Sequence, residues 1–361
     1  MEKYTAILLS RQPLRPTSDT TWVRGVVAAV RWLQERRIGV ISSVGMQTWE
    51  LVTAATSDLG LPVKLVLPIP IGLEFDTQRE QILYEYDLDP SRTEFLPVSG
   101  GDNLMLQRDR VVFELADLLL PVSISKTGSM AERLHQVDLD KHTIDDRFQI
   151  PYRQRREPIK VELDPDRLSD EILSTGDDYL IHWTRGVSHP WPSERMIDFY
   201  RAVINSDHWP RSGLATLERI IDTQTVLASP RHMPGGVMTI SFSALRPCEV
   251  IPLMRWRARY GEMSFEPYGI GLTREIAQQI DIHPVNYYRA DDKKSIPAEL
   301  AWLSQSKGKI TDWRGEKEYR HLGDLSLEEI PPDAIVLYCR TSVEAERLQH
   351  RYPYRVVPFL R

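Results

Sequence analysis

The first 145 residues alternate between short apolar runs and longer stretches with an apolar residue every three or four positions. The short runs are typical of buried strands, and they lie at Thr5–Leu9, Gly39–Ser43, Pro62–Leu67 and Leu118–Val122. The longer stretches, Asp19–Arg36 and Thr48–Leu59, have the period of amphipathic helices. Strand, helix and strand in this order predict βαβ units, so residues 1–145 are expected to form a parallel sheet covered by helices.

Small polar loops follow two of these predicted strands. Each loop precedes a predicted helix, and backbone N–H groups and the helix dipole favour an anion at such a place. The residues expected to contact the anion are Ser42, Ser43 and Gly45 in the first loop and Lys126, Gly128 and Ser129 in the second, with Arg110 of the Arg108-Asp109-Arg110 sequence as a cationic partner. The pattern therefore predicts one anion-binding crevice at the carboxyl edge of the sheet. The alternative is a parallel sheet that binds no ligand.

From residue 178 onward the pattern changes to many short strands and few helices. The predicted strands are Asp178–Ile181, Val226–Ser229, Gly236–Ser243, Tyr268–Leu272, Val285–Tyr288, Glu316–Arg320, Ala334–Cys339 and Tyr354–Pro358. Helices are expected at Leu214–Ile221 and Thr273–Gln279. Residues 146–177 are basic and weakly periodic, which is typical of a linker. The expected organisation is α/β: a parallel-sheet domain at 1–145, a linker at 146–177 and a strand-rich α+β domain at 178–361.

The most informative segment for chemistry is 311–320, Thr-Asp-Trp-Arg-Gly-Glu-Lys-Glu-Tyr-Arg. In a strand, alternation places Glu316, Glu318 and Arg320 on one face. Two carboxylates and a guanidinium suit a cleft that holds a polar or cationic group. A solvated strand with an ion pair on its face is the alternative.

Two upstream strands carry further polar side chains. Alternation puts Thr239, Ser241 and Ser243 on one side of an otherwise apolar strand, where they line either a polar pocket or an exposed sheet face. His182 falls at the end of the strand at 178–181, where a side chain can reach a cleft, and Thr184 follows it. These residues and the late strand are the candidate functional residues of the second domain.

Composition narrows the class of protein. A chain of 361 residues exceeds one compact core, and 42% hydrophobic with 27% charged residues is ordinary for a soluble protein. No apolar run is long enough for a membrane helix and no signal peptide is expected, so a cytoplasmic location is the default. With Cys248 and Cys339 alone, no disulfide framework and no metal site are expected. The net charge of -6 argues against a protein that coats nucleic acid, although Arg255–Tyr260 predicts either phosphate and base contacts or an amphipathic helix.

The loops of the first domain carry a resemblance. Ser42–Gly45 after a strand, Arg108–Arg110 before Ala116-Asp117, and Gly128-Ser129 after the next strand resemble a Rossmann-like superfamily. It includes the DNA-processing protein of natural transformation, the cytokinin-releasing phosphoribohydrolases and nucleotide-sensing domains of phage-defence systems. The hydrolase branch has a glycine-rich loop with a catalytic glutamate, whereas Lys126–Ala131 has one glycine and no glutamate. The resemblance therefore implies nucleotide binding rather than phosphoribohydrolase activity.

The second domain also resembles a known fold. His182-Trp183-Thr184, Ser241-Phe242-Ser243, Tyr268–Gly271 and Trp313–Arg320, in this order, resemble the ADP-ribosyltransferase-like fold of abortive-infection and DNA-targeting toxin proteins. The resemblance implies NAD as the ligand. It also implies a role for each matched residue: His182 on the nicotinamide ribose with Thr184 in support, Ser241 and Ser243 beside the nicotinamide, Glu318 as the catalytic carboxylate with Glu316 as second candidate, and Arg320 on a diphosphate or on Glu318. The arginine and tyrosine of well-studied toxins have no match, which leaves a substrate other than NAD open.

The combined interpretation is a cytoplasmic nucleotide- or nucleic-acid-modifying enzyme, a transferase or hydrolase of a phage-defence or DNA-modification system. One alternative is an enzyme that remodels a modified base, such as a 7-deazaguanine, in DNA without NAD. Another is a non-catalytic sensor of a nucleotide signal. The expected partners are a nucleotide ligand and DNA or a modified base, with no membrane and no metal. The sequence leaves the oligomeric state and the acceptor open.

Overall fold

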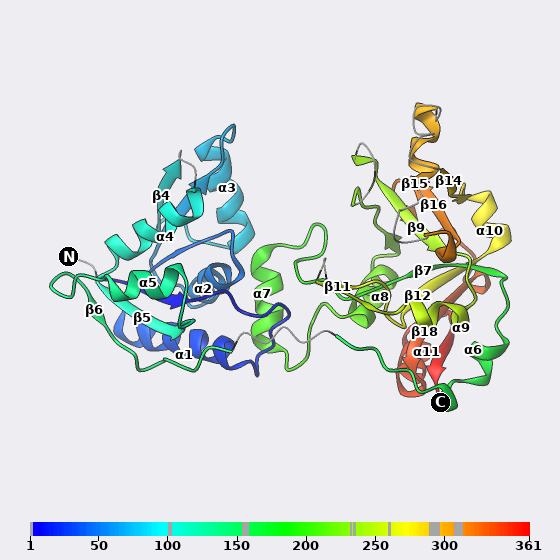
Figure 1. Cartoon of the computed structure of the whole chain (residues 1–361), viewed down its shortest axis with the longest axis horizontal. Coiled ribbons are helices and arrows are strands. Elements are labelled where there is room, and N and C mark those ends of the chain that lie inside the picture. The colour runs from blue at the N-terminus through cyan, green and yellow to red at the C-terminus, as the bar shows by residue number, and fades with distance from the viewer. Residues whose placement is uncertain are drawn as a thin grey trace. The chain divides into compact units, whose positions relative to one another are not determined.

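The computed structural model describes residues 3–361 except 100–102, 154–158, 232, 234–235, 259–260, 289–296 and 307–312 (Figure 1). The chain divides into two compact units. The first unit comprises residues 1–157 and 188–210, and the second comprises 158–187 and 211–361. Residues 188–210, which the sequence pattern grouped with the second domain, thus pack with the first unit.

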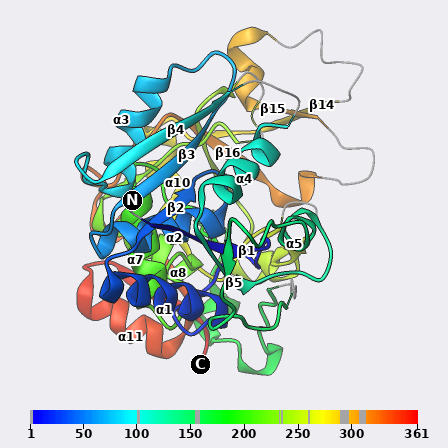
Figure 2. The same cartoon turned by 90° about the vertical axis from the view of Figure 1, so that its left-hand side faces the viewer.

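A parallel sheet forms the centre of the first unit (Figure 2). Within the described residues it has six strands in the order β4-β3-β2-β1-β5-β6, all parallel. They are β1 (Tyr4–Leu9), β2 (Gly39–Ser43), β3 (Val63–Ile69), β4 (Thr93–Ser99), β5 (Leu118–Ser123) and β6 (Thr143–Ile144). The strand order reverses at β1, as in doubly wound Rossmann-like sheets. The predicted parallel α/β architecture of this unit is confirmed.

Helices cover both faces of this sheet. They are α1 (Thr21–Arg36), α2 (Gln47–Asp58), α3 (Phe75–Tyr86), α4 (Leu104–Leu115), α5 (Ser129–His135) and the inserted α7 (Met196–Asn205). Alternate residues of β1 enter two different apolar clusters: Ile7 packs with Val26 and Val30 of α1, whereas Leu8 packs with Phe113 of α4. Because successive strand residues point to opposite faces, these clusters are the two cores of a covered sheet.

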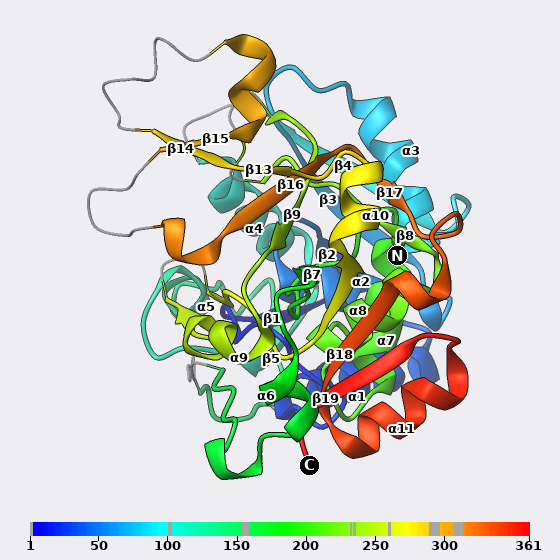
Figure 3. The same ribbon diagram turned by 90° about the vertical axis from the view of Figure 1, so that its right-hand side faces the viewer.

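The second unit is built on a mixed sheet (Figure 3). Its described part has seven strands in the order β13-β16-β9-β7-β12-β18-β19. Only β18 and β19 run parallel among these neighbours in the described chain. The strands are β7 (Tyr179–Trp183), β9 (Thr239–Ser243), β12 (Gly269–Thr273), β13 (His283–Pro284), β16 (Glu318–Leu322), β18 (Ile335–Thr341) and β19 (Arg355–Leu360). The predicted strand-rich character of this half is confirmed.

Short elements complete the second unit. The helices are α6 (Asp170–Ser174), α8 (Gly213–Asp222), α9 (Pro247–Val250), α10 (Arg274–Gln279) and α11 (Ser342–Arg351). Strand pairs outside the main sheet join β8 (Thr225–Val226) to β17 (Leu325–Ser326), β10 (Trp256–Arg257) to β11 (Glu262–Met263), and β14 (Asn286–Tyr288) to β15 (Ser304–Ser306). Leu337 of β18 and Leu217 of α8 lie in the same buried apolar cluster.

Several predicted boundaries change in the structure. Trp313–Glu316 is a 3-10 turn, so the late strand starts at Glu318 and Glu316 precedes it. The prediction of an amphipathic helix at Arg255–Tyr260 is wrong, because Trp256–Arg257 forms the short strand β10. Arg259 and Tyr260, like residues 311–312 of the late segment, lie outside the described residues. The segment 146–177, expected as a linker, contains the short helix α6.

Glycine in β12 allows close packing between strands, which generates a stability prediction. A Cβ at Gly271 would lie 2.7 Å from Cγ1 of Val336, its partner in β18, and 3.1 Å from Cε2 of Tyr338. Val336 is buried and cannot move aside easily. We expect Gly271→Ala to lower the free energy of unfolding by roughly 1–3 kcal/mol through overpacking, measured by urea denaturation. Gly315→Ala is the control, because no atom of the described residues lies within 4 Å of a Cβ at that position. Equal midpoints for the two variants would contradict the packing argument.

Candidate functional site

A polar cavity of about 510 Å³ lies in the second unit. We call it the second-unit cavity. It collects every candidate residue that the sequence offered for the second domain: His182, Thr184, Ser241, Ser243, Glu316, Glu318 and Arg320. These residues span more than a third of the chain, so the fold is what brings them together.

Strand pairing explains how these side chains meet. In the register of β16 and β9, Glu318 lies opposite Ser243 and Arg320 lies opposite Ser241. The next strand, β7, pairs with β9 and supplies His182. Residues two apart in a strand share a face, so Glu318, Arg320 and Ser241 lie on one side of the sheet. The predicted alternation in the late strand is confirmed for Glu318 and Arg320.

Glu318 is held in a fixed position by an ion pair. Nε of Arg320 donates to Oε1 at 2.8 Å and Nη2 donates to Oε2 at 3.1 Å, while the Ser241 hydroxyl donates to Oε1 at 2.8 Å. Arg320 is 3% exposed, and its other N–H groups bond to the Trp302 carbonyl and the Gln305 side chain. Charge-assisted, bidentate contacts of this kind fix geometry as well as charge.

Glu316 lies in a different environment from Glu318. Burial raises the pKa of Glu316 to about 7, and the charge of Glu318 adds to the rise, whereas Arg257 and Arg255 oppose it. The Ser243 hydroxyl donates to the Glu316 carbonyl at 2.8 Å and so holds the turn in place. Two carboxyl groups in one cavity, one fixed by an arginine and one with a raised pKa, form the usual arrangement for divided acid–base roles.

His182 presents a hydrogen-bond acceptor to the cavity. Its Nδ1 lies 2.9 Å from the Ser241 carbonyl, and because a carbonyl only accepts, Nδ1 carries the hydrogen. Burial lowers the pKa of His182, and Arg185 lowers it further although the Ser241 bond opposes this. The imidazole is therefore neutral at pH 7, with the lone pair on Nε2.

Two predicted ligand contacts have structural roles instead. Thr184 is 3% exposed, and its hydroxyl donates to the Gly213 carbonyl at 2.8 Å. Ser243 is 5% exposed and its hydroxyl is engaged with Glu316. Ser241 is exposed to the cavity. Of the two serines expected beside a ligand, only Ser241 is thus open to one.

Three further arginines line the described cavity and were not among the candidates: Arg185, Arg231 and Arg257. Arg185 and Arg231 lie in loops, where no periodicity marks a side chain as inward-facing. Arg257 belongs to the arginine- and tryptophan-containing segment that the sequence did single out. Among these arginines, Arg185 could have been added to the candidates from the sequence, because it directly follows the candidate residue Thr184.

In the first unit, the two serines that end β2 face the interior. Ser42 and Ser43 are fully buried. The hydroxyl of Ser42 donates to the Trp49 carbonyl at 3.2 Å, and that of Ser43 donates to the Val66 carbonyl at 2.6 Å. These hydroxyls hold α2 and β3 to β2. The expectation that they contact an anion is corrected on this ground.

In the loop after β2, the backbone N–H of Gly45 donates to a carboxylate of the protein itself. Gly45 N–H donates to Oε1 of Glu50 at 3.1 Å, and the Tyr200 hydroxyl donates to Oε2 at 2.7 Å. Burial raises the pKa of Glu50, although both bonds and the charge of Arg108 oppose the rise. The position expected for a ligand anion is therefore filled internally.

The cation beside this loop is Arg108 rather than Arg110. Arg108 is 2% exposed, pairs with Asp109 at 2.8 Å and donates to the Val44 carbonyl at 3.0 Å. Arg110 lies on the outer face of α4 and pairs with Glu114 at 2.6 Å, with both side chains more than half exposed. The expectation that Arg110 binds an anion is therefore corrected.

The loop after β5 is small, polar and exposed, as predicted. The end of β1 separates it from the loop after β2, with which it was expected to form one crevice. Lys126, Gly128 and Ser129 are exposed, and Gly128 has a φ of 102°. Strand β1 lies between β2 and β5, and its following residue Ser10 accepts from the Ser125 N–H at 2.9 Å. The two loops share the carboxyl edge of the sheet, separated by the end of β1.

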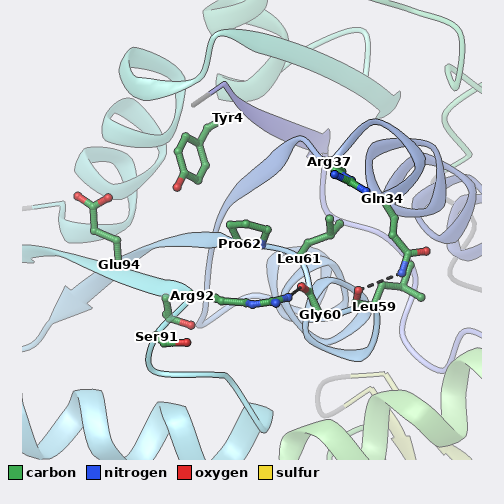
Figure 4. A pocket seen from close by; sticks show the side chains of 11 residues that line it. Tyr4, Gln34, Arg37, Leu59, Gly60, Leu61, Pro62, Ser91, Arg92 and Glu94 are labelled. Atoms are coloured by element: carbon green, nitrogen blue, oxygen red, sulfur yellow. Dashed lines mark hydrogen bonds between the residues drawn. The ribbon is translucent and has the colours of Figure 1, made fainter. Parts of the chain in front are cut away.

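A pocket of about 690 Å³ lies at the opposite edge of this sheet (Figure 4). Tyr4, Pro62 and Thr93, at the starts of three strands, line it. Two of its polar side chains are engaged: Gln34 donates to the Leu59 carbonyl at 3.0 Å and Arg92 to the Gly60 carbonyl at 2.7 Å. Without a carboxyl pair or a histidine among its lining residues, it is not the candidate active site.

In the described part of the chain, no three histidine, cysteine or acidic side chains gather as a metal site would require. Among the described helices, none combines the length and the apolar character needed to cross a membrane.

The raised pKa of Glu316 predicts a pH dependence of stability. The folded-state pKa of about 7 lies above the ordinary value of 4.5, so folding favours the protonated form. This contribution is fully present below 4.5 and is lost as the pH rises through about 7. We expect Glu316→Gln, which stays neutral, to unfold at a higher temperature than the wild type at pH 8 and at a similar temperature at pH 5. Thermal unfolding at both values measures this, and a difference that does not grow with pH would contradict it.

Comparisons with known proteins give little further identification. No family model matches this chain, and no curated protein matches it. Among solved structures, DNA processing protein A from Helicobacter pylori, which binds single-stranded DNA, matches at 15% identity with a TM-score of 0.25. The match covers 35% of this chain and 56% of that one, and at this TM-score it carries no argument. The Rossmann-like description of the first unit rests on its strand order, and the ADP-ribosyltransferase-like character of the second stays a prediction.

Proposed function

We propose that the second unit is a nucleotide- or nucleic-acid-modifying enzyme that breaks a glycosidic bond in an ADP-ribosyltransferase-like cleft. The observation that carries the proposal is the carboxyl pair: Glu318 fixed by Arg320 and Glu316 with a pKa of about 7, both in one cavity. Enzymes that act at a sugar carbon commonly use two carboxyl groups in unlike environments. The phage-defence or DNA-modification setting stays an expectation from resemblance.

Each carboxyl group has a distinct role in this proposal. When the bond between sugar C1′ and the base nitrogen breaks, its electron pair leaves with the base and positive charge develops on the sugar. Glu318, held by Arg320 and Ser241, stabilises that charge without needing to reorient. Glu316 in its ionised form takes the proton from the water or acceptor hydroxyl that attacks C1′.

The remaining side chains suit a sugar-containing substrate. Nε2 of neutral His182 is an acceptor for a ribose hydroxyl, as the resemblance implies. A cavity of about 510 Å³ is within the ordinary range for small-molecule sites. NAD fits this donor and acceptor set as a substrate, since it offers a ribose hydroxyl to His182 and a glycosidic bond to the carboxyl pair.

The direct test is incubation of the protein with NAD, alone and with DNA, followed by mass spectrometry of all products. Nicotinamide release or transfer of ADP-ribose to DNA is the expected result. Release or conversion of a modified base without NAD consumption would support the base-remodelling alternative. No change in any substrate would contradict the proposal and favour a sensor.

Glu318→Gln alone does not separate a loss of activity from a loss of stability, because Glu318 is also the counter-ion of Arg320. We therefore predict the outcome of this variant together with that of a matched double variant. Glu318→Gln should lower activity by roughly 10²-fold or more, since charge stabilisation is lost. It should also lower stability by roughly 3–5 kcal/mol, because buried Arg320 loses its counter-ion.

The double variant Glu318→Gln/Arg320→Gln removes both charges and separates the two effects. We expect it to recover most of the unfolding temperature while remaining inactive, as measured by thermal unfolding and NAD turnover. Wild-type turnover by a folded double variant would refute Glu318 as the carboxylate that stabilises the reacting sugar.

A further inference from the structure

We propose that Arg185, Arg231 and Arg257 form an anion subsite of the second-unit cavity that binds the phosphate groups of a small nucleotide. The proposal deepens the proposed function by naming the substrate class, and it rests on that function only for the identity of the reacting bond. Phosphate binding itself can be measured without turnover.

The three arginines reach the cavity from separate parts of the unit. Arg185 follows β7, Arg231 follows the bridge at Ser229, and Arg257 ends β10. All three line the same cavity as the carboxyl pair. Guanidinium groups from independent elements that meet in one cavity are typical of phosphate recognition, because each presents a planar fork of donors.

Electrostatics within this group favour an added anion. Arg185 and Arg231 share one carboxylate: Glu262 lies 3.4 Å from Nη1 of Arg185 and 2.8 Å from Nη1 of Arg231. Burial lowers the pKa of Arg185 even though Glu262 opposes this, and the charges of Arg231 and Arg257 lower it further. Like charges held together at a partly buried site are stabilised by any anion that enters it.

The other carboxylate near Arg185 is already engaged. Glu266 is 7% exposed and accepts from the backbone N–H groups of Gly186 at 2.9 Å and Gly213 at 3.1 Å. Its role is to hold the loop after β7 against the start of α8. Glu262 is thus the acidic side chain that the described structure pairs with both Arg185 and Arg231.

The remaining wall indicates a nucleotide rather than a bare phosphate or a nucleic-acid strand. Leu227, Met233 and Phe265 line the same cavity and offer apolar surface for a base. The volume of about 510 Å³ suits a small molecule. A bound strand would need an extended basic surface, whereas the chain as a whole carries a net charge of -6.

The test is titration calorimetry of the full chain with inorganic pyrophosphate at fixed ionic strength. We expect saturable binding that Arg231→Gln and Arg257→Gln each weaken by about 10-fold or more, because each variant removes a charge-assisted contact to the anion. Arg231 is suited to this test because its side chain is 40% exposed and its loss leaves the core intact. Arg246→Gln is the matched control, because Arg246 is an exposed arginine of the same unit that pairs with Glu249 outside the cavity.

Two outcomes would overturn the subsite. One is no saturable pyrophosphate binding by the wild type, and the other is equal binding by Arg231→Gln and Arg246→Gln. Tighter binding of a single-stranded oligonucleotide than of pyrophosphate, weakened by Arg231→Gln, would replace the small nucleotide with nucleic acid. Pyrophosphate binding without any NAD turnover would support the subsite and contradict the proposed reaction. NAD turnover without pyrophosphate binding would support the reaction and contradict the subsite.

Discussion

The second unit depends on one buried ion pair, between Glu318 and Arg320. Removing a guanidinium from water is costly, and attraction to a carboxylate offsets that cost only when the remaining donors are also satisfied. Arg320 meets this condition through the Trp302 carbonyl and the Gln305 side chain. The pair therefore fixes the segment around 302–305 against β16 and aligns the Glu318 carboxylate with Ser241 of β9. Glu318, the carboxylate proposed to act on the substrate, is therefore also a structural residue.

The same pair also affects the neighbouring carboxyl group of Glu316. Arg320 donates to both oxygens of Glu318, and Glu316 has no comparable contact among the described residues. Glu316 is instead partly buried beside the charge of Glu318. Burial raises its pKa most, and that charge adds to the rise. Two carboxyl groups that are two residues apart in the sequence therefore lie in unlike environments.

The sequence placed two of the second-domain candidates on one face of a strand because strand alternation is a strong constraint. Glu318 and Arg320 share a face for that reason. Glu316 reaches the same cavity by another route, through a 3-10 turn and a positive φ of 45° at Lys317, which alternation does not describe. The cavity arginines lie in irregular segments, and Arg185 and Arg231 carry no periodic signal at all.

In the first unit, the predicted strands and helices were largely found, but the predicted anion site was not. Small polar residues after a strand suit a phosphate loop, yet the same residues suit a helix packed tightly on a sheet, which is the role of Ser42 and Ser43. Helix α4 begins at Leu104, so Arg108 and Arg110 both lie inside it. Because two positions on a helix differ by about 200°, the residue turned inward is Arg108 and Arg110 faces water.

An internal carboxylate is present at both places where an anion was considered, and its contacts decide which place suits a ligand. Glu50 accepts from Gly45 N–H and the Tyr200 hydroxyl, both neutral donors, and a ligand anion would have to displace it against its own charge. Glu262 instead faces two guanidinium groups with a single negative charge. Its carboxylate orients Arg185 and Arg231. With Arg257 and the engaged Glu266 counted, three positive charges face two negative ones, so an anion adds to this group rather than competing with it. Charge balance thus places phosphate recognition beside the carboxyl pair of the second unit, not at the glycine loop of the first.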